Sequence, residues 1–292
     1  MPKKNNDHKK NVLIAGCGDV GSTLGQQLAE TGYFNVWGLR RNITLLPECI
    51  HPISWDFSQP LPNGIGPETV DYFIYSAAPN ERTPAGYQLG YITGLQHCLD
   101  YLATNQQQPA RAFLTSSTSV YHQNTGEWVN ETSPTQPTSF RGKTILAAEQ
   151  LLLNSGIPAT VVRFGGIYRP GKNRLIDNIR SGKGSQDTSD TFSNRIHRDD
   201  CAGILAFLIN RDNKKEQVDS LYLGVDCMPA SLHDVQQWLA LRLEITLDYS
   251  LPVMARGNKR CSNRKLLAQG YSFIYPNYRE GYSALLDKQN QS

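Results

Sequence analysis

The stretch NVLIAGCGDVGSTLGQQLAETG, residues 11–32, decides the fold of this chain. It begins with a short apolar run, residues 12–15, which predicts a buried β-strand. The glycine-rich sequence GCGDVG, residues 16–21, follows at once, and apolar residues then recur at helical spacing as far as Leu28. A buried strand, a glycine turn and an amphipathic helix in this order are typical of a parallel α/β fold.

The three glycines of the turn have the spacing GxGxxG, which is typical of dinucleotide-binding folds. Gly16 allows the chain to turn sharply, Gly18 allows a pyrophosphate to approach the backbone, and Gly21 allows the helix to pack close to the strand. Asp19 and Val20 stand at the helix start, where free N–H groups and the positive end of the helix dipole would bind the phosphates. A tight turn without any ligand is the structural alternative.

The second predicted strand, residues 34–39, ends in Arg40 and Arg41. In dinucleotide-binding folds an acidic residue at this place binds the 2′-hydroxyl of the adenosine ribose, whereas arginine accommodates a 2′-phosphate. No acidic residue stands here, so the two arginines predict NADP as the cofactor, with NAD as the second choice. A solvated basic turn is the alternative explanation.

Further strands are predicted at residues 51–57, 71–76, 111–115 and 159–164, with a crossover helix at residues 87–102. This alternation predicts an α/β fold built on a doubly wound, parallel Rossmann sheet. Ligands of such sheets bind at the carboxyl ends of the strands. The residues near these ends complete the predicted cofactor site: Asp56, Phe57, Ala77, Ala78, Pro79 and Ser116.

The composition is that of an ordinary globular protein. Of the 292 residues 39% are hydrophobic and 19% charged, and a net charge of +3 is too small to indicate nucleic-acid binding. No apolar run reaches the length of a membrane span. Residues 1–10 are polar and basic, which predicts a disordered tail rather than a signal peptide. We therefore expect a cytoplasmic protein that binds neither nucleic acid nor membrane.

The six cysteines are scattered, without a CxxC pair or a Cys/His cluster at metal-ligand spacing. This pattern predicts a reduced protein without a metal site. Cys17 lies inside the glycine turn, where the helix start could lower the pKa of its thiol. The alternative is that Cys17 is only a small side chain that fits the turn.

Eight short segments carry a resemblance to a known family. They are, in chain order, the glycine turn, Arg40-Arg41, Asp56, Ala77-Ala78, SSTSVY at 116–121, EWVNE at 127–131, RFGGIYRPG at 163–171 and RIHRDD at 195–200. In this order they resemble the extended short-chain dehydrogenase/reductases, the family that includes NAD(P)-dependent epimerases and dehydratases acting on nucleotide sugars. The chain is most similar to the atypical branch of that family.

The resemblance implies two domains and a small-molecule substrate, for which a nucleotide sugar is one candidate. Residues 11–167 would form the NAD(P)-binding Rossmann domain, and residues 168–292 mostly a smaller C-terminal substrate lobe. Segments near 195–200 and 220–224 would return to the first domain, and residues 171–194 would form a flexible segment over the substrate. The implied substrate-binding residues are Thr118, Tyr121, Tyr168, Arg169, Arg195 and His197.

The catalytic pattern of the family is incomplete in this chain. Ser117 occupies the place of the family's serine or threonine. The YxxxK pair, whose tyrosine is the general acid/base and whose lysine lowers the pKa of that tyrosine, should follow about two dozen residues later. Alignment on the following helix puts Arg141 in the tyrosine position and Ile145 in the lysine position. A shift by one residue gives Phe140 and Thr144, so neither register restores the pair.

The missing YxxxK pair leaves two possible functions. In the first, the protein is an oxidoreductase or epimerase in which another group transfers the proton and Lys143 is a displaced electrostatic partner. The candidate donors are Tyr91, Tyr121, Tyr168 and His197. In the second, the protein binds NADP(H) without turnover, as a sensor or regulatory module. A further alternative is that Arg141 binds an anionic group of the substrate.

Overall fold

The computed structural model describes residues 9–171, 173–186, 191–252 and 257–289, which divide into two compact units. The described residues within 1–116, 143–162 and 202–220 form unit 1, and those within 117–142, 163–201 and 221–292 form unit 2. Of the predicted tail at residues 1–10, residues 1–8 lie outside the described residues, and the first strand begins at Lys10. The predicted domain boundary at residue 167 stays a prediction.

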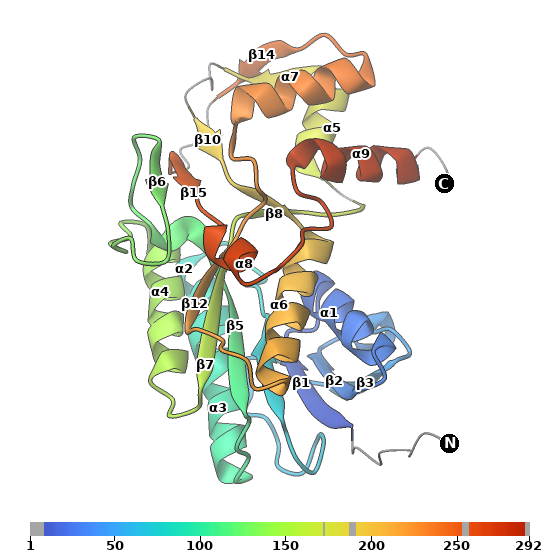
Figure 1. Ribbon diagram of the computed structural model, residues 1–292, viewed down its shortest axis with the longest axis vertical. Helices are drawn as coiled ribbons and strands as arrows, with labels where there is room; N and C mark the ends of the chain where they lie inside the picture. The colour runs from blue at the N-terminus through green and yellow to red at the C-terminus, as the bar shows by residue number, and fades with distance from the viewer. Residues whose placement is uncertain (1–8, 172, 187–190, 253–256, 290–292) are drawn as a thin grey trace. The chain divides into compact units, whose positions relative to one another are not determined.

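The central element is a parallel sheet of seven strands in the order β12-β7-β5-β4-β1-β2-β3 (Figure 1). The strands are β1 (Lys10–Ala15), β2 (Phe34–Arg40), β3 (Ile50–Ser54), β4 (Tyr72–Tyr75), β5 (Arg111–Ser117), β7 (Ala159–Phe164) and β12 (Leu221–Gly224). The strand order reverses between β1 and β4, because β2 and β3 extend the sheet on one side and the later strands on the other. The predicted doubly wound α/β fold is therefore confirmed.

The middle strands are buried on both faces, which explains their continuous apolar sequences. Val12, Leu13 and Ile14 of β1 and all four residues of β4 are shielded from solvent. Each strand of a parallel sheet has helices on both faces, so alternation of polar and apolar residues is not required. This is why the apolar run at residues 12–15 identifies a strand at the centre of the sheet.

Helices and helical turns surround the sheet strands of unit 1 in sequence. They are α1 (Asp19–Glu30), a 3-10 turn (Ile43–Leu45), α2 (Pro84–Tyr87), a π-helical turn (Gln88–Thr93), α3 (Gly94–Thr104), most of α4 (Phe140–Leu153) and most of α6 (Arg198–Asn213). The single crossover helix predicted at 87–102 is thus three consecutive helical pieces. Among the described residues, no helix combines the length and apolarity that crossing a bilayer requires.

Unit 2 is built from short strand pairs and helices. A 3-10 turn (Thr118–Val120) precedes β6 (Glu127–Val129), which pairs with β15 (Lys259–Cys261); β8 (Gly166–Tyr168) pairs with β11 (Arg195–His197), β9 (Lys183–Ser185) with β14 (Asp248–Leu251), and β10 (Phe192–Ser193) with β13 (Ala230–Ser231). The helices are α5 (Arg174–Arg180), α7 (Leu232–Leu243), α8 (Arg264–Ala268) and α9 (Tyr278–Gln289). An apolar core joins Tyr168 to residues of α5, α7 and α9.

Residues 171–194, expected to be a flexible segment, contain regular structure where they are described. Helix α5 begins after Asn173, whose side chain accepts hydrogen bonds from the backbone N–H groups of Leu175 and Ile176. Ile176 and Ile179 are then buried in the core of unit 2. The polar composition of the segment concealed these two apolar anchors at helical spacing. Residues 172 and 187–190 of this segment lie outside the described residues.

A network of charged and polar side chains ties the end of α6 to the sheet within unit 1. Asp212 accepts hydrogen bonds from Arg111 Nε at 2.7 Å and from the Tyr72 hydroxyl at 3.0 Å. Arg111 also donates to Thr160 Oγ1 at 3.2 Å. The Asp212 and Arg111 side chains are only 12% and 17% exposed, so each carries a largely desolvated charge that needs its partner.

Replacing Asp212 tests how much this network contributes to the free energy of unfolding. Asp212→Ala would leave the Arg111 charge without its carboxylate, and we expect a loss of about 2 to 3 kcal/mol in the free energy of unfolding by urea. Glu216→Ala is the matched control, because Glu216 pairs with Arg211 at 2.9 Å but is 43% exposed. That change should cost less than about 1 kcal/mol. Equal losses of unfolding free energy in the two variants would show that the Asp212–Arg111 pair contributes no more than an exposed ion pair.

Candidate functional site

The glycine turn between β1 and α1 brings two backbone segments of unit 1 into direct contact. Gly16 has a φ of +83°, which favours glycine, and a Cβ added to it would lie 2.4 Å from the backbone nitrogen of Ala77. The Gly16 and Cys17 N–H groups both donate to the carbonyl oxygen of Leu39, at 3.2 and 3.0 Å. Any side chain at position 16 would push the end of β4 away from the turn.

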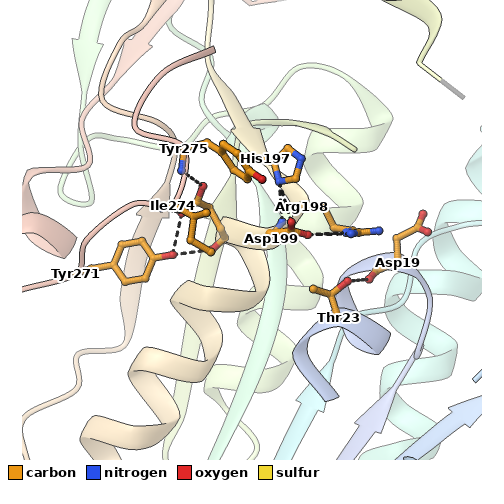
Figure 2. Close-up of polar contacts among 9 residues, drawn as sticks. Asp19, Thr23, His197, Arg198, Asp199, Tyr271, Ile274 and Tyr275 are labelled. Atoms are coloured by element: carbon orange, nitrogen blue, oxygen red, sulfur yellow. Dashed lines mark hydrogen bonds and ion pairs between the residues drawn. The ribbon is translucent and has the colours of Figure 1, made fainter. Parts of the chain in front are cut away.

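The other two glycines of the turn have different surroundings. A Cβ at Gly21 would lie 3.1 Å from Ile14 Cγ2 and 3.0 Å from the Gly16 carbonyl oxygen, so Gly21 lets α1 pack tightly on β1. At Gly18 the nearest atom to an added Cβ is 4.0 Å away. Gly18 is also the N-cap of α1, and no side chain of the described residues caps this helix, so open space adjoins the positive end of its dipole. Figure 2 shows Thr23 donating to the carbonyl oxygen of Asp19 one turn further on.

Cys17 is a buried side chain of the turn and not an activated thiol. Burial raises the pKa of its thiol to about 11, although the hydrogen bond with Ser22 and the charge of Arg40 act in the opposite direction. The suggestion that the helix start lowers this pKa is therefore wrong, since desolvation outweighs the favourable charges. The thiol fills the space next to Gly38, where an added Cβ would lie 3.0 Å from Cys17 Sγ.

The two arginines at the end of β2 have different partners. Arg40 Nη1 donates to the carbonyl oxygen of Cys17 at 3.3 Å and so lies against the glycine turn. Arg41 donates to Asn80 Oδ1 at 2.6 Å and lies 3.8 Å from an Asp56 carboxylate oxygen. Hydrogen bonds from Ser58 hold the pKa of Asp56 below its usual value, with a smaller contribution from the Arg41 charge. The turn thus adjoins the Arg40 cation, whereas Arg41 contacts Asn80 and Asp56.

The remaining predicted cofactor residues of unit 1 differ in how accessible they are. Ala77 is buried against the turn, and Ala78 is exposed. Phe57 lies edge-on to Trp55, with ring centroids 5.0 Å apart, and Pro79 is half-buried. Ser116 is buried, and its hydroxyl donates to the buried Glu149 carboxylate. The Ser116 hydroxyl therefore stabilises the interior and is already engaged.

Ser117, the residue in the place of the family's serine, ends β5. Its Oγ accepts a hydrogen bond from the Ser119 N–H at 3.1 Å and caps the 3-10 turn Thr118–Val120. Ser117 and Thr118 are both half-buried. The hydroxyl of Ser117 retains its proton for a further hydrogen bond, because here it acts only as an acceptor.

The Tyr121 hydroxyl is held by two hydrogen bonds within unit 2. It accepts a hydrogen bond from Arg163 Nη1 at 2.9 Å and donates to the Asn130 carbonyl oxygen at 2.8 Å. The Arg163 guanidinium also lies over the tyrosine ring, 4.9 Å from its centroid. Burial raises the pKa of Tyr121 to about 12 although Arg163 lowers it. Both hydrogen-bonding positions of the phenol are filled by the protein.

The positions aligned with the missing tyrosine and lysine lie near the start of α4. Arg141 and Lys143 are exposed, whereas Ile145 is 3% exposed and belongs to the core. Arg141 lies over the ring of Phe140, 5.5 Å from its centroid. A Cβ at Gly142 would lie 2.6 Å from the Ser119 carbonyl oxygen, so the helix start packs closely on the 3-10 turn that follows Ser117.

His197, at the end of β11, is held by neighbouring groups of unit 2. Its Nδ1 accepts a hydrogen bond from the Asp199 N–H at 3.1 Å, which requires the neutral ring with its proton on Nε2 (Figure 2). The Asp199 carboxylate binds Arg198 at 2.9 and 3.0 Å. The His197 ring also packs against Tyr275, with ring centroids 4.2 Å apart, and is 1% exposed.

Comparison with known proteins gives the family. A structure described as an NAD-dependent epimerase/dehydratase from Methylobacillus flagellatus is 34% identical, has a TM-score of 0.79, and is matched over 97% of this chain and 100% of its own. The chain belongs to the NAD-dependent epimerase/dehydratase family. The resemblance stated from the sequence is thereby confirmed. No family model and no curated protein matches the sequence.

Two more distant structures share the fold. MoeE5 in complex with UDP-glucuronic acid and NAD is 20% identical, with a TM-score of 0.78 over 96% of this chain and 99% of its own. The human epimerase family protein SDR39U1 with NADPH is 20% identical, with a TM-score of 0.76 over 95% of this chain and 99% of its own. At these identities the likeness concerns the fold alone.

Asp200 is a buried carboxylate at the end of the RIHRDD segment, and its role could not be inferred from the sequence. Asp200 accepts hydrogen bonds from the N–H groups of Ile274 at 2.7 Å and Tyr275 at 2.9 Å, and from the Tyr271 hydroxyl at 3.0 Å. Figure 2 shows these three donors. Burial raises the pKa of Asp200 although the hydrogen bonds lower it. Asp200 therefore anchors residues 271–275 to the first turn of α6.

A second carboxylate, Asp226, was missed because no motif marks it. It is 2% exposed; one oxygen accepts a hydrogen bond from the Met228 N–H at 3.1 Å, and the other has no hydrogen-bond partner among the described residues. Burial raises the pKa of Asp226 to about 7, the Met228 bond and Arg195 lower it, and Asp200 raises it. The predicted substrate residues Tyr168 and Arg195 lie in the same buried region, whereas Arg169 is half-buried and donates to Pro170.

The raised pKa of Asp226 predicts a pH dependence of stability. Between the unfolded value of 3.8 and about 7 the folded chain holds a proton that the unfolded chain releases, so stability falls as the pH rises through this range. Between pH 5 and pH 8 the free energy of unfolding should fall by about 2 to 3 kcal/mol less in Asp226→Asn than in the unmodified chain, measured by urea unfolding. Asp56→Asn, at an exposed carboxylate whose pKa is lowered, is the control. Unchanged pH dependence in Asp226→Asn would contradict the assignment.

Proposed function

We propose that the chain binds a nicotinamide dinucleotide at the glycine turn of unit 1. The observation that carries the proposal is the contrast between the glycines. A Cβ at Gly16 or Gly21 would lie within 3.1 Å of the protein's own atoms, whereas at Gly18 nothing lies closer than 4.0 Å. A turn with only a structural role would need the close approaches at Gly16 and Gly21. It would not need an open surface at Gly18, beside the uncapped start of α1. That surface suits a pyrophosphate.

The charges at the end of β2 support NADP(H) over NAD(H). Arg40 and Arg41 have unused guanidinium donors to offer a 2′-phosphate, and the nearby Asp56 carboxylate offsets only one of the two positive charges. NADPH in the human SDR39U1 structure and NAD in MoeE5 indicate that this fold accepts either dinucleotide. The difference between them is therefore set by side chains such as these.

The family and its neighbours support an oxidoreductase or epimerase acting on a nucleotide sugar or a small carbonyl or hydroxyl compound. When bound, the nicotinamide would supply hydride transfer. Ser117 would donate its free proton to a substrate oxygen, and the exposed Arg141 would bind an anionic group of the substrate, for which the sugar-linked diphosphate is a candidate. Lys143, also exposed, would add positive charge.

A specific observation favours the second function, an NADP(H)-binding module with slow or no turnover. Three of the four groups that could replace the family's tyrosine, Tyr121, Tyr168 and His197, are buried, and Tyr91 is half-buried. Burial raises the pKa of Tyr91 and of Tyr121 to about 12 and that of Tyr168 further, and His197 is 1% exposed. A general acid works best with a pKa near the operating pH, and these phenols lie far from it. We therefore favour the binding module.

The cofactor preference is the first prediction of this proposal. NADPH should bind at least tenfold more tightly than NADH, since a charge-assisted hydrogen bond contributes about 1.5 to 3 kcal/mol. Arg40→Ala combined with Arg41→Ala should remove most of that difference, measured by calorimetric or fluorescence titration. Gly18→Val is the control for the location, because it should abolish binding of both dinucleotides in a folded protein. Equal affinities in the unmodified protein would refute the preference, and unchanged affinity in Gly18→Val would refute the site.

The second prediction restores the missing pair. Arg141→Tyr with Ile145→Lys places a phenol and an ammonium one turn apart on α4. General acid/base catalysis contributes about 10²- to 10⁴-fold, so reductase or epimerase activity on nucleotide sugars should rise well above that of the unmodified chain. Arg141→Phe with Ile145→Lys is the control that lacks only the phenolic hydroxyl. Ordinary turnover by the unmodified chain would show that the binding-module function is wrong while leaving the cofactor site intact.

A further inference from the structure

Unit 2 contains buried polar atoms without a hydrogen-bond partner among the described residues, and three of these atoms belong to elements packed on one another. They are the Tyr168 hydroxyl oxygen, Arg195 Nε and one carboxylate oxygen of Asp226. Tyr168 and Asp226 are 4% and 2% exposed. A buried polar atom that stays unsatisfied destabilises the folded state, and three together would cost much of the stability of a domain.

The three residues come from elements that are packed on one another. The Asp226 N–H donates to the Arg195 carbonyl oxygen at 2.7 Å, so their backbones are neighbours. Arg195 Nη1 donates to the Tyr282 hydroxyl at 3.0 Å, and the Tyr282 ring stacks on the Tyr168 ring at 4.4 Å. After burial, the Asp226 charge is the largest influence that raises the pKa of Tyr168. Tyr168 at the end of β8 and Arg195 at the start of β11 therefore belong to one cluster with Asp226.

The local packing makes room for the Tyr168 hydroxyl. A Cβ at Gly281, the residue before Tyr282, would lie 1.8 Å from the Tyr168 oxygen, so only glycine at position 281 allows the hydroxyl to occupy its place. The same tyrosine belongs to the apolar core that α5, α7 and α9 share.

We propose that Tyr168, Arg195 and Asp226 bind one buried water molecule as a permanent part of unit 2. The water accepts hydrogen bonds from Arg195 Nε and from the Tyr168 hydroxyl and donates one to the unpartnered Asp226 oxygen. Three bonds to otherwise unsatisfied groups are what buried waters typically make. Tyr168 and Arg195 then serve the interior of the unit and do not contact substrate.

The direction in which Tyr168→Phe changes the stability of the protein tests the proposal. Removing a hydroxyl that binds water should lower the folded-to-unfolded ratio about fivefold, as for loss of one hydrogen bond. Removing a hydroxyl without a partner should leave the ratio unchanged or raise it, which would overturn the proposal. Tyr271→Phe is the matched control, because the Tyr271 hydroxyl donates directly to Asp200 and its loss should show that urea unfolding detects one buried bond.

A crystal structure of the full chain, at a resolution that shows ordered water, separates the remaining outcomes. A water molecule within hydrogen-bonding distance of all three atoms would support the proposal, and it should be lost or displaced in Tyr168→Phe. A direct hydrogen bond from Tyr168 to Asp226, with no water between them, would overturn it even if Tyr168→Phe is destabilised.

Discussion

The structure of unit 1 depends on one contact between backbones. At Gly16 the chain leaves β1 so close to the end of β4 that even a methyl group would lie 2.4 Å from the Ala77 nitrogen. This approach fixes where α1 starts, and the start of α1 in turn fixes the open surface at Gly18 and the position of Arg40 against Cys17. A binding surface made of backbone atoms needs no particular side chain. The sequence therefore indicates it mainly by the spacing of its glycines.

Much of unit 1 could be predicted because its signals are local. A buried parallel strand gives a continuous apolar run, and the turn that follows β1 requires glycine at fixed intervals. Unit 2 was harder, because its short strand pairs and the helix α5 depend on contacts between distant segments. Residues 174–180 look polar as a sequence, yet Ile176 and Ile179 bury one face of a helix. Similarly, Asp226 is chemically unusual through burial, and burial is a property of the fold.

The candidate catalytic residues divide in the same way. The sequence identified Ser117, Arg141 and Ile145 by alignment with family motifs, and those positions could be named without a structure. It could not show that Tyr121 is held by Arg163 and Asn130, or that Ser116 binds Glu149. A tyrosine near a motif is a candidate acid until its partners are known. For Tyr121 the partners belong to the protein, so its phenol is already engaged.

The anchor formed by Asp200 has a consequence for the order in which the chain acquires its structure. Asp200 receives its three hydrogen bonds from residues 271–275, and the core of unit 2 includes Tyr282, Leu285 and Leu286 of α9. These residues follow α5 and α7 in chain order, so they are synthesised after them. Domains usually fold as units while the chain emerges from the ribosome. The core of unit 2 therefore stays incomplete while α5 and α7 are already present and α9 has yet to emerge.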